Sequence, residues 1–174
     1  MAASVTSGFE PFFRDVSVNP NIIPMDDTAQ DEKKRSKYVF IDSRDRNTVK
    51  HNSANKYEIS FNEPFENVIS VELISIKLPF PDINEPYIIM KVSGMNIIQS
   101  NNNIANQSTV IIYENPDSTN INFHDSVMKV FKPPISMNKF KVSFYKYNGE
   151  LYDFTNLDHS IVLKITTLKQ GRRL

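Results

Sequence analysis

The stretch YEISFNEPFENVISVELISIKLP, from Tyr57 to Pro79, predicts two β-strands that meet at a hinge. Apolar and polar residues alternate within each half, and a period of two is typical of a strand that buries one face. The residues Asn62-Glu63-Pro64 interrupt the alternation and mark the hinge. We therefore expect one strand over Tyr57–Phe61 and a second, longer strand over Asn67–Leu78.

The longer half changes the face on which its apolar residues fall. Ile69, Val71 and Leu73 share one phase of the alternation, whereas Ile74, Ile76 and Leu78 share the other. One extra residue in a strand produces such a change, so the pattern predicts a β-bulge near Leu73. A strand that is buried on both faces is the alternative interpretation.

The same period recurs along the chain. Near the C-terminus, Phe140, Val142 and Phe144 alternate with Lys139, Lys141 and Ser143. In all, the patterns predict about nine strands, over Tyr38–Ile41, Tyr57–Phe61, Asn67–Leu78, Tyr87–Val92, Ser108–Tyr113, Ser126–Phe131, Phe140–Tyr145, Leu151–Phe154 and Ile161–Ile165. Asn148-Gly149 lies between two of these strands and predicts a type I′ hairpin, in which both central residues have positive φ.

The absence of a helical pattern sets the expected fold class. Parallel strands usually need crossover helices, so we expect antiparallel pairing. We predict an all-β fold, an antiparallel jelly-roll-like β-sandwich with an extended N-terminal arm. An immunoglobulin-like or other Greek-key arrangement is the alternative. The polar segments Gln99–Gln107 and Asn115–Asn122 are expected to form long surface loops.

The N-terminal residues 1–37 form the arm in this prediction, and residues 38–174 form the sandwich domain. The arm shows neither helical nor strand periodicity. It nevertheless carries large apolar side chains, which water disfavours, so another surface is expected to cover them. That surface is either the chain's own domain or a neighbouring subunit. The candidate partner-binding residues of the arm are Phe9, Phe12, Phe13, Ile22 and Ile23.

Composition argues against several classes of protein. The chain has no cysteine, which excludes a disulfide scaffold, a thiolate metal site and a cysteine nucleophile. Its 20 basic and 20 acidic residues give zero formal net charge, so we expect no nucleic-acid partner. No apolar run approaches the ~20 residues that span a bilayer, and the N-terminal residues lack the apolar core of a signal peptide.

Candidates for catalysis are weak. The three histidines, His51, His124 and His159, lack the paired spacing of zinc sites, so we expect no metal and no cofactor. His159 follows Asp158, and we interpret it as closing a turn rather than as an acid or base. The two arginines of Ser43–Arg46 suggest either a phosphate clamp or, as the favoured interpretation, an ion-pair network in a loop. We predict that the chain is not an enzyme.

Motifs near both ends of the domain follow a recognisable order. A Ser43-Arg44-Asp45 turn precedes a strand that begins with Tyr57 and then the segment Asn67–Leu73. Pro133-Pro134, an alternating strand, the Asn-Gly hairpin and finally Asp158-His159-Ser160 follow toward the C-terminus. In this order the chain resembles the minor capsid proteins of nucleocytoplasmic large DNA viruses. The middle of the chain, from about residue 82 to 125, carries no matching motif.

The resemblance implies a structural protein of the virion, a jelly-roll-like cement protein on the inner side of the icosahedral shell, assembled in the host cell cytoplasm. The implied partners are the capsomers of the major capsid protein, other minor capsid proteins, copies of itself and inner-membrane proteins. One alternative is a penton-type jelly roll at the vertices. Another is a carbohydrate-binding or ligand-binding β-sandwich, suggested by the tyrosines Tyr145, Tyr147 and Tyr152 around one hairpin.

Overall fold

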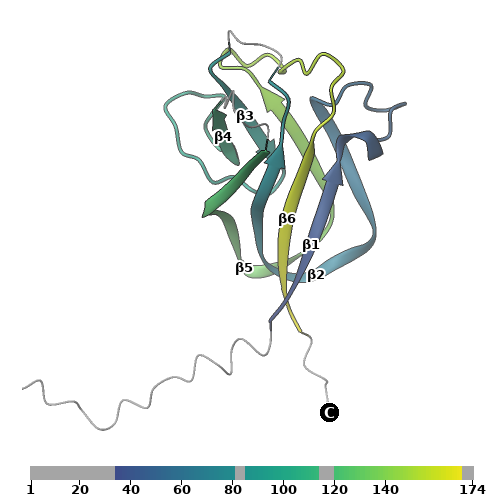
Figure 1. The fold of residues 1–174 in the computed structure, drawn as a ribbon. Coiled ribbons are helices and arrows are strands. Elements are labelled where there is room, and N and C mark those ends of the chain that lie inside the picture. The colour runs from purple at the N-terminus through teal and green to yellow at the C-terminus, as the bar shows by residue number, and fades with distance from the viewer. Residues whose placement is uncertain (1–33, 81–84, 114–119, 170–174) are drawn as a thin grey trace, which may run out of the picture.

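The fold is a single antiparallel sheet that curls into a half-barrel (Figure 1). The computed structural model describes residues 34–80, 85–113 and 120–169. Its strands are β1 (Lys34–Asp42), β2 (Lys56–Lys77), β3 (Tyr87–Val92), β4 (Val110–Tyr113), β5 (Asn120–Tyr145) and β6 (Ser160–Leu168), and a short 3-10 turn, η1 (Ser43–Asp45), follows β1. They lie in the order β1-β6-β2-β5-β3-β4. The all-β, antiparallel prediction is confirmed, and these ranges contain no α-helix.

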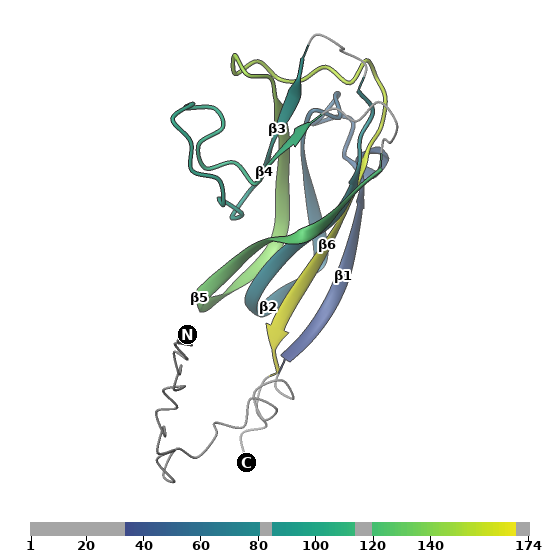
Figure 2. The same cartoon turned by 60° about the vertical axis from the view of Figure 1, so that its left-hand side comes forward.

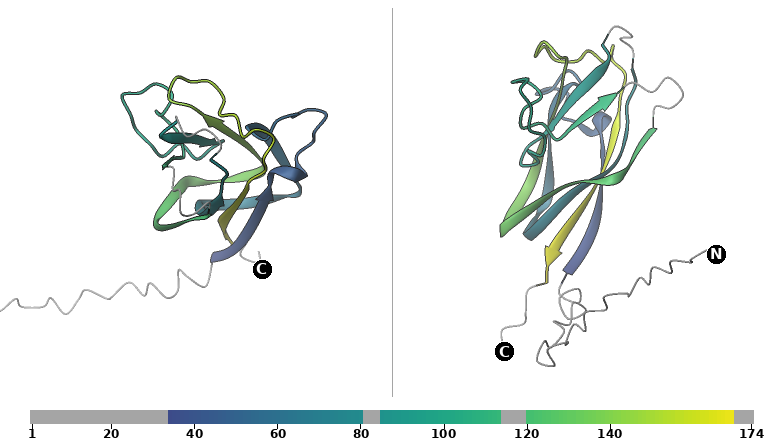
Figure 3. Two further views of the ribbon diagram at one scale, coloured as in Figure 1. Left: turned by 45° about the horizontal axis from the view of Figure 1, so that its top comes forward. Right: turned by 90° about the vertical axis from the view of Figure 1, so that its left-hand side faces the viewer.

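The long strands β2 and β5 give the sheet its curl. They pair from Lys56↔Ser143 at one end to Lys77↔Asn120 at the other, and the register shifts at several points between Ser60 and Ser75. Each such shift bends and twists the ladder without ending it. Figures 2 and 3 show the result, in which the first half of β5 runs obliquely to β1.

The prediction of nine separate strands is therefore wrong. Tyr57–Phe61 and Asn67–Leu78 belong to β2, apart from Leu78, which follows it, and Ser126–Phe131 and Phe140–Tyr145 both belong to β5. The expected hinges are bends inside continuous strands, because residues near them, such as Phe65 and Met137, remain paired.

The β-bulge predicted near Leu73 is confirmed. The register of β2 shifts between Leu73 and Ser75 against both of its neighbours, β5 and β6. Val71 and Leu73 are buried before the shift and Ile76 is buried after it. The bulge therefore keeps the apolar residues of β2 on the core side while the strand bends.

The core fills the inside of the curl. β1, β6, the second half of β2 and the first half of β5 form one half of the sheet, and the remaining strand segments form the other. Fully buried side chains come from both halves, among them Leu73, Ile161 and Leu163 from the first and Tyr57, Phe140 and Phe144 from the second. One continuous apolar cluster thus holds the two halves together.

The hairpin after β5 differs from the prediction. Gly149 has φ +91°, but Asn148 is not among the residues with positive φ. The Gly149 N–H donates to the Lys146 carbonyl (3.1 Å), and the Lys146 N–H donates to the Glu150 carbonyl (2.8 Å). This pattern is a type I turn followed by a left-handed glycine rather than a type I′ turn.

The expected strand at Leu151–Phe154 is also absent. Only Leu151 bridges to Tyr145, and the residues after it have no strand ladder. Tyr152 and Phe154 are nevertheless buried and lie in contact, with ring centroids 5.0 Å apart. Their alternating burial gave a strand-like pattern because side chains of a loop, rather than of a strand, cover the core.

The two expected surface loops are described to different extents. The loop containing Gln99–Gln107 is ordered by Asn102, whose Oδ1 accepts N–H groups from Ile104 (2.7 Å) and Ala105 (3.1 Å). Most of Asn115–Asn122 lies outside the described residues, and β5 already begins at Asn120.

The sheet already includes Lys34, so the four residues 34–37, which the sequence assigned to the arm, belong to β1. Lys34 pairs with Leu168, and the register continues without a shift to Asp42 and Ser160. The side chains of residues 34–37 are all exposed, so this part of the strand lacks the apolar alternation by which sequence reasoning identifies a strand. The arm residues Phe9, Phe12, Phe13, Ile22 and Ile23 lie outside the described residues.

Two shortened chains test this boundary. A chain that starts at residue 38 lacks the four pairs from Lys34↔Leu168 to Lys37↔Ile165 that a chain starting at residue 34 retains. We expect the shorter chain to unfold roughly 5 °C lower, because it loses backbone pairing at the edge of the sheet. Thermal unfolding followed by circular dichroism measures the difference. Equal midpoints would mean that these pairs contribute nothing to stability.

Candidate functional site

A buried serine ties the end of β1 to the start of β6. The Ser43 Oγ donates to Asp158 Oδ1 (2.7 Å) and accepts the backbone N–H of His159 (3.0 Å). The Ser43 N–H donates to the His159 carbonyl (2.9 Å). Ser43 itself is fully buried, and its bond to the His159 N–H is buried, whereas its bond to Asp158 is partly buried because Asp158 lies at the surface. We call this set of contacts the Ser43–His159 lock.

Two arginines complete the turn that follows β1. Arg46 Nη1 donates to the Ser43 carbonyl (2.6 Å) and to Asp158 Oδ1 (3.1 Å). Arg44 holds Asp42 in a two-point ion pair, with distances of 2.9 Å from Nε to Oδ1 and 2.6 Å from Nη2 to Oδ2. The hydrogen bonds from Arg44 lower the pKa of Asp42 to about 2. The predicted ion-pair network of Ser43–Arg46 is thereby confirmed.

His159 is an interior packing group. Its ring is 3% exposed and lies against Phe144, with ring centroids 4.6 Å apart. The Tyr57 hydroxyl and His159 Nε2 form a hydrogen bond of 3.0 Å, whereas Nδ1 has no partner among the described groups. Burial lowers the pKa of His159 to about 4, so the ring is neutral at pH 7. Its backbone N–H bonds to Ser43, which is 116 residues away, so His159 joins two strands rather than closing a local turn.

The three tyrosines that suggested the alternative of a ligand-binding module do not share one surface. Tyr152 is fully buried, and Tyr145 lies beneath Lys91, whose Nζ is 5.6 Å from the ring centroid. Only Tyr147 is well exposed, and its ring contacts Tyr87 at a centroid distance of 6.3 Å. The hairpin therefore distributes these three rings over different environments.

The side of β1, β6, β2 and the first half of β5 that points away from the core forms one broad surface. Directly paired residues on adjacent strands point to the same side, so the register identifies its members. Three rows cross the strands, namely Tyr38–Lys164–Glu72–Met128, Ser36–Thr166–Ser70–Val130 and Phe40–Val162–Ser75. We call the surface made by these rows the docking face.

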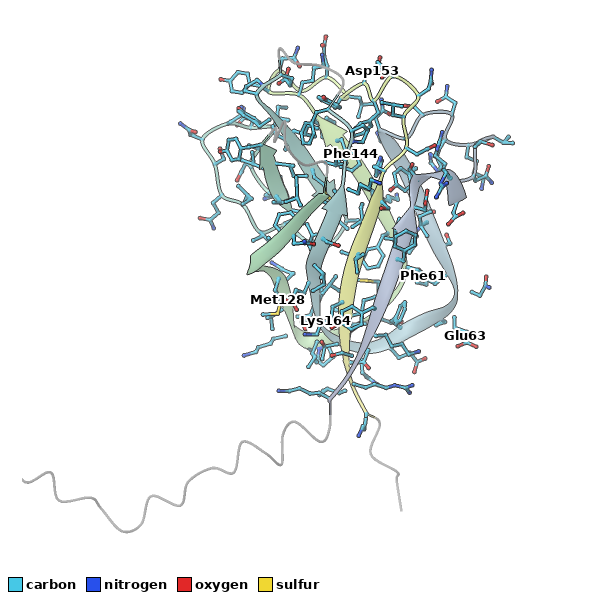
Figure 4. All side chains as sticks on the ribbon, viewed as in Figure 1. Phe61, Glu63, Met128, Phe144, Asp153 and Lys164 are labelled. Carbon is cyan, nitrogen blue, oxygen red and sulfur yellow. The ribbon has the colours of Figure 1, made fainter. Side chains whose placement is uncertain are left out.

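Large apolar side chains are exposed on the docking face. Tyr38 is 69% exposed, Phe40 65%, Val130 48% and Met128 40%. Between them, Lys164 Nζ lies 3.4 Å from Glu72 Oε2, so the centre of the face carries an ion pair (Figure 4 labels Met128 and Lys164). Large exposed apolar patches often mark interaction sites, so these side chains make the docking face a candidate for one.

Sequence reasoning did not identify this surface. The run Tyr38–Ile41 is apolar at every position, and such a run gives no sign of which face meets the core. In the structure Val39 and Ile41 are buried, whereas Tyr38 and Phe40 point outward. The signal that could have revealed it is the presence of two aromatic residues at alternate positions of a short strand.

Neither a metal-binding cluster nor a membrane-spanning helix is found in the part of the chain that the structure describes. No three histidine or carboxylate side chains there are grouped so as to hold a metal ion. No helix in those ranges has the length and apolar character needed to cross a membrane.

Removing the hydroxyl group of Ser43 tests the lock. Ser43→Ala deletes one buried and one partly buried hydrogen bond, and we expect the free energy of unfolding to fall by about 1–3 kcal/mol. Ser36→Ala is a matched control, because its hydroxyl group lies 3.1 Å from Thr166 Oγ1 at an exposed position. The control should change stability by less than about 0.5 kcal/mol. Urea unfolding measures both values, and similar losses would contradict the special role of Ser43.

The low pKa of His159 predicts how stability depends on pH. Its pKa is about 4 in the folded chain and 6.5 when unperturbed, so between these values the unfolded chain binds a proton that the folded chain does not. The free energy of unfolding should therefore be constant above pH 6.5 and decrease by about 3 kcal/mol toward pH 4. Asp42 contributes only at lower pH, because its pKa falls from 3.8 to about 2.

Urea unfolding at several values between pH 7 and pH 4 measures this decrease. His159→Gln should remove most of it, whereas His51→Gln, at a partly exposed position, should retain it. Equal decreases in the two variants would show that another group is responsible.

Comparison with protein-family models and curated proteins identifies no family for this chain. No protein-family model matches the chain, and no curated protein matches it.

Proposed function

We propose that this chain is a structural minor capsid protein, a cement subunit that joins major capsid capsomers on the inner side of a large icosahedral DNA virus shell. The observation that carries the proposal is the docking face, on which Tyr38 and Phe40 expose aromatic rings from a rigid sheet. A surface that is already ordered loses little conformational entropy when it binds a partner. This property suits a protein that holds other subunits in place.

The motifs behind the viral resemblance support a structural role. Ser43-Arg44-Asp45 and Asp158-His159-Ser160 are more than one hundred residues apart in the sequence, yet they meet in the Ser43–His159 lock. The contacts of Ser43, Asp158 and His159 in this region are used to join two strands. Motifs that join strands maintain the fold, and proteins of a shell family that share a fold would share such motifs.

The proposal includes a finer description of the fold. The two halves of the curled sheet would correspond to the two layers of a jelly-roll-like β-sandwich, with β2 and β5 running through both. Loops at one end and the arm at the other would then be free to meet different neighbours. The proposed neighbours are capsomers, other minor capsid proteins, further copies of this chain and inner-membrane proteins.

Binding through the docking face would rely on the burial of aromatic surface. Tyr38 and Phe40 expose more than three fifths of their area, and each buried aromatic ring contributes on the order of 2 kcal/mol. The zero formal net charge of the chain means that copies would not repel one another at long range. Repetition over a closed shell would then sum many modest contacts.

Substitution on the docking face tests the proposal. The double variant Tyr38→Glu and Phe40→Glu places two charges on exposed positions, so we expect normal folding but at least tenfold lower incorporation into particles. Val49→Glu is the control, because Val49 is 96% exposed outside this face. Quantitative mass spectrometry of purified particles gives the copies per major capsid protein. Equal incorporation of both variants would contradict docking through this face.

The same measurement on the unsubstituted chain separates the alternatives. A copy number comparable to the number of capsomers supports a cement protein beneath the facets. A small number tied to the vertices supports the penton-type alternative. Absence of the chain from particles would reject both structural roles.

A further inference from the structure

A groove of about 760 Å³ lies at the end of the docking face where β1 begins and β6 ends. All four strands of this half of the sheet contribute to its lining. Ile69, Met128, Val130 and Pro134 supply apolar surface, and Val130 is nearly half exposed. Such a groove gains free energy when apolar groups enter it. It is therefore a docking site whose occupant can be sought from its chemistry.

The charge of the groove restricts the choice of occupant. Its lining contains three lysines, Lys34, Lys132 and Lys164, and includes no acidic side chain. Lys164 is paired with Glu72, which offsets part of this positive charge. A complementary segment would carry apolar rings together with carboxylates.

The arm of the same chain contains such a segment. Phe9-Glu10-Pro11-Phe12-Phe13-Arg14-Asp15 places three aromatic residues between and beside two acids. Pro11 lacks a backbone N–H, so the segment suits binding through its side chains on a sheet face better than pairing along a strand edge. Each phenylalanine can bury on the order of 150–200 Å².

The position of the groove favours the chain's own arm over that of another copy. Lys34 both lines the groove and follows the arm directly, so the tether begins at the binding site. Residues 14–33 separate the segment from Lys34, and they span up to ~70 Å when extended. Tethering of this kind gives a local concentration in the millimolar range, roughly a thousand times that of a micromolar protein solution.

We propose that residues Phe9–Phe13 occupy the groove of their own chain while the protein is unassembled. The inference concerns the isolated protein and does not depend on the proposed role in a shell. The segment covers Met128 and Val130, which are part of the docking face. A partner that binds this end of the face must therefore displace the arm, which makes the contact autoinhibitory.

Crosslinking in the full-length chain tests the proposal, because the natural sequence has no cysteine. Arg14→Cys next to the segment is combined with Met128→Cys in the groove. The control combines Arg14→Cys with Val49→Cys, since Val49 is more exposed than Met128 but lies outside the groove. We expect an intramolecular disulfide at Met128 to form at least ten times faster than at Val49, at a rate independent of protein concentration.

Further variants test whether the crosslink depends on the phenylalanines of the arm and on the position in the groove. Adding Phe12→Ser and Phe13→Ser should slow the reaction at Met128 to the rate of the control. Thr166→Cys offers a second groove position in case Met128→Cys disturbs the fold. Equal rates at the groove and at Val49 would overturn the groove as the docking site. Covalent dimers through Met128 that increase with concentration would show that the occupant is the arm of a second copy, and would overturn docking in the same chain.

Discussion

The bend that β2 and β5 share is the constraint on which the rest of the structure depends. The two strands pair from end to end, so each half of the sheet is aligned by the same ladder. The shift between Leu73 and Ser75 turns the apolar residues of β2 back toward the core as the strand changes direction. Without that shift, one half of β2 would expose its apolar side chains. Core and docking face are thus the two sides of one bent ladder.

The Ser43–His159 lock holds the end of β1, which lies at the edge of the sheet. Among the described residues, β1 is an edge strand that pairs only with β6, and its last residue leads directly into the buried Ser43. Hydrogen bonds from this serine to Asp158 and His159 anchor the end of β1 against the start of β6. The aromatic rings of Tyr38 and Phe40 are therefore presented from a strand that is secured at its far end. The hydrogen bonds of Ser43 therefore both stabilise the lock and hold the strand that carries Tyr38 and Phe40.

The parts of this structure that the sequence predicted are those in which burial leaves a local trace. The bulge at Leu73 was visible because burial must alternate, and the ion pair of Arg44 with Asp42 was visible because the opposite charges are close in the sequence, whereas the partner of Arg46, Asp158, is distant in the sequence. Continuity of a strand through a bend leaves no such trace, so β2 and β5 were each divided. The docking face escaped detection for a related reason, since the apolar run Tyr38–Ile41 does not reveal which side lacks a cover.

The first residues of β1, 34–37, affect how readily the edge of the sheet pairs with another chain. An open edge strand presents free backbone groups to which another chain can add, which is the usual route to uncontrolled polymerisation. Here Lys34, Arg35 and Lys37 occupy that half with exposed, positively charged side chains, while the aromatic residues follow at Tyr38 and Phe40. Like charges oppose edge-to-edge addition of identical chains. One strand thus carries aromatic side chains that can bind another surface and charged side chains that oppose the addition of a further strand along its edge.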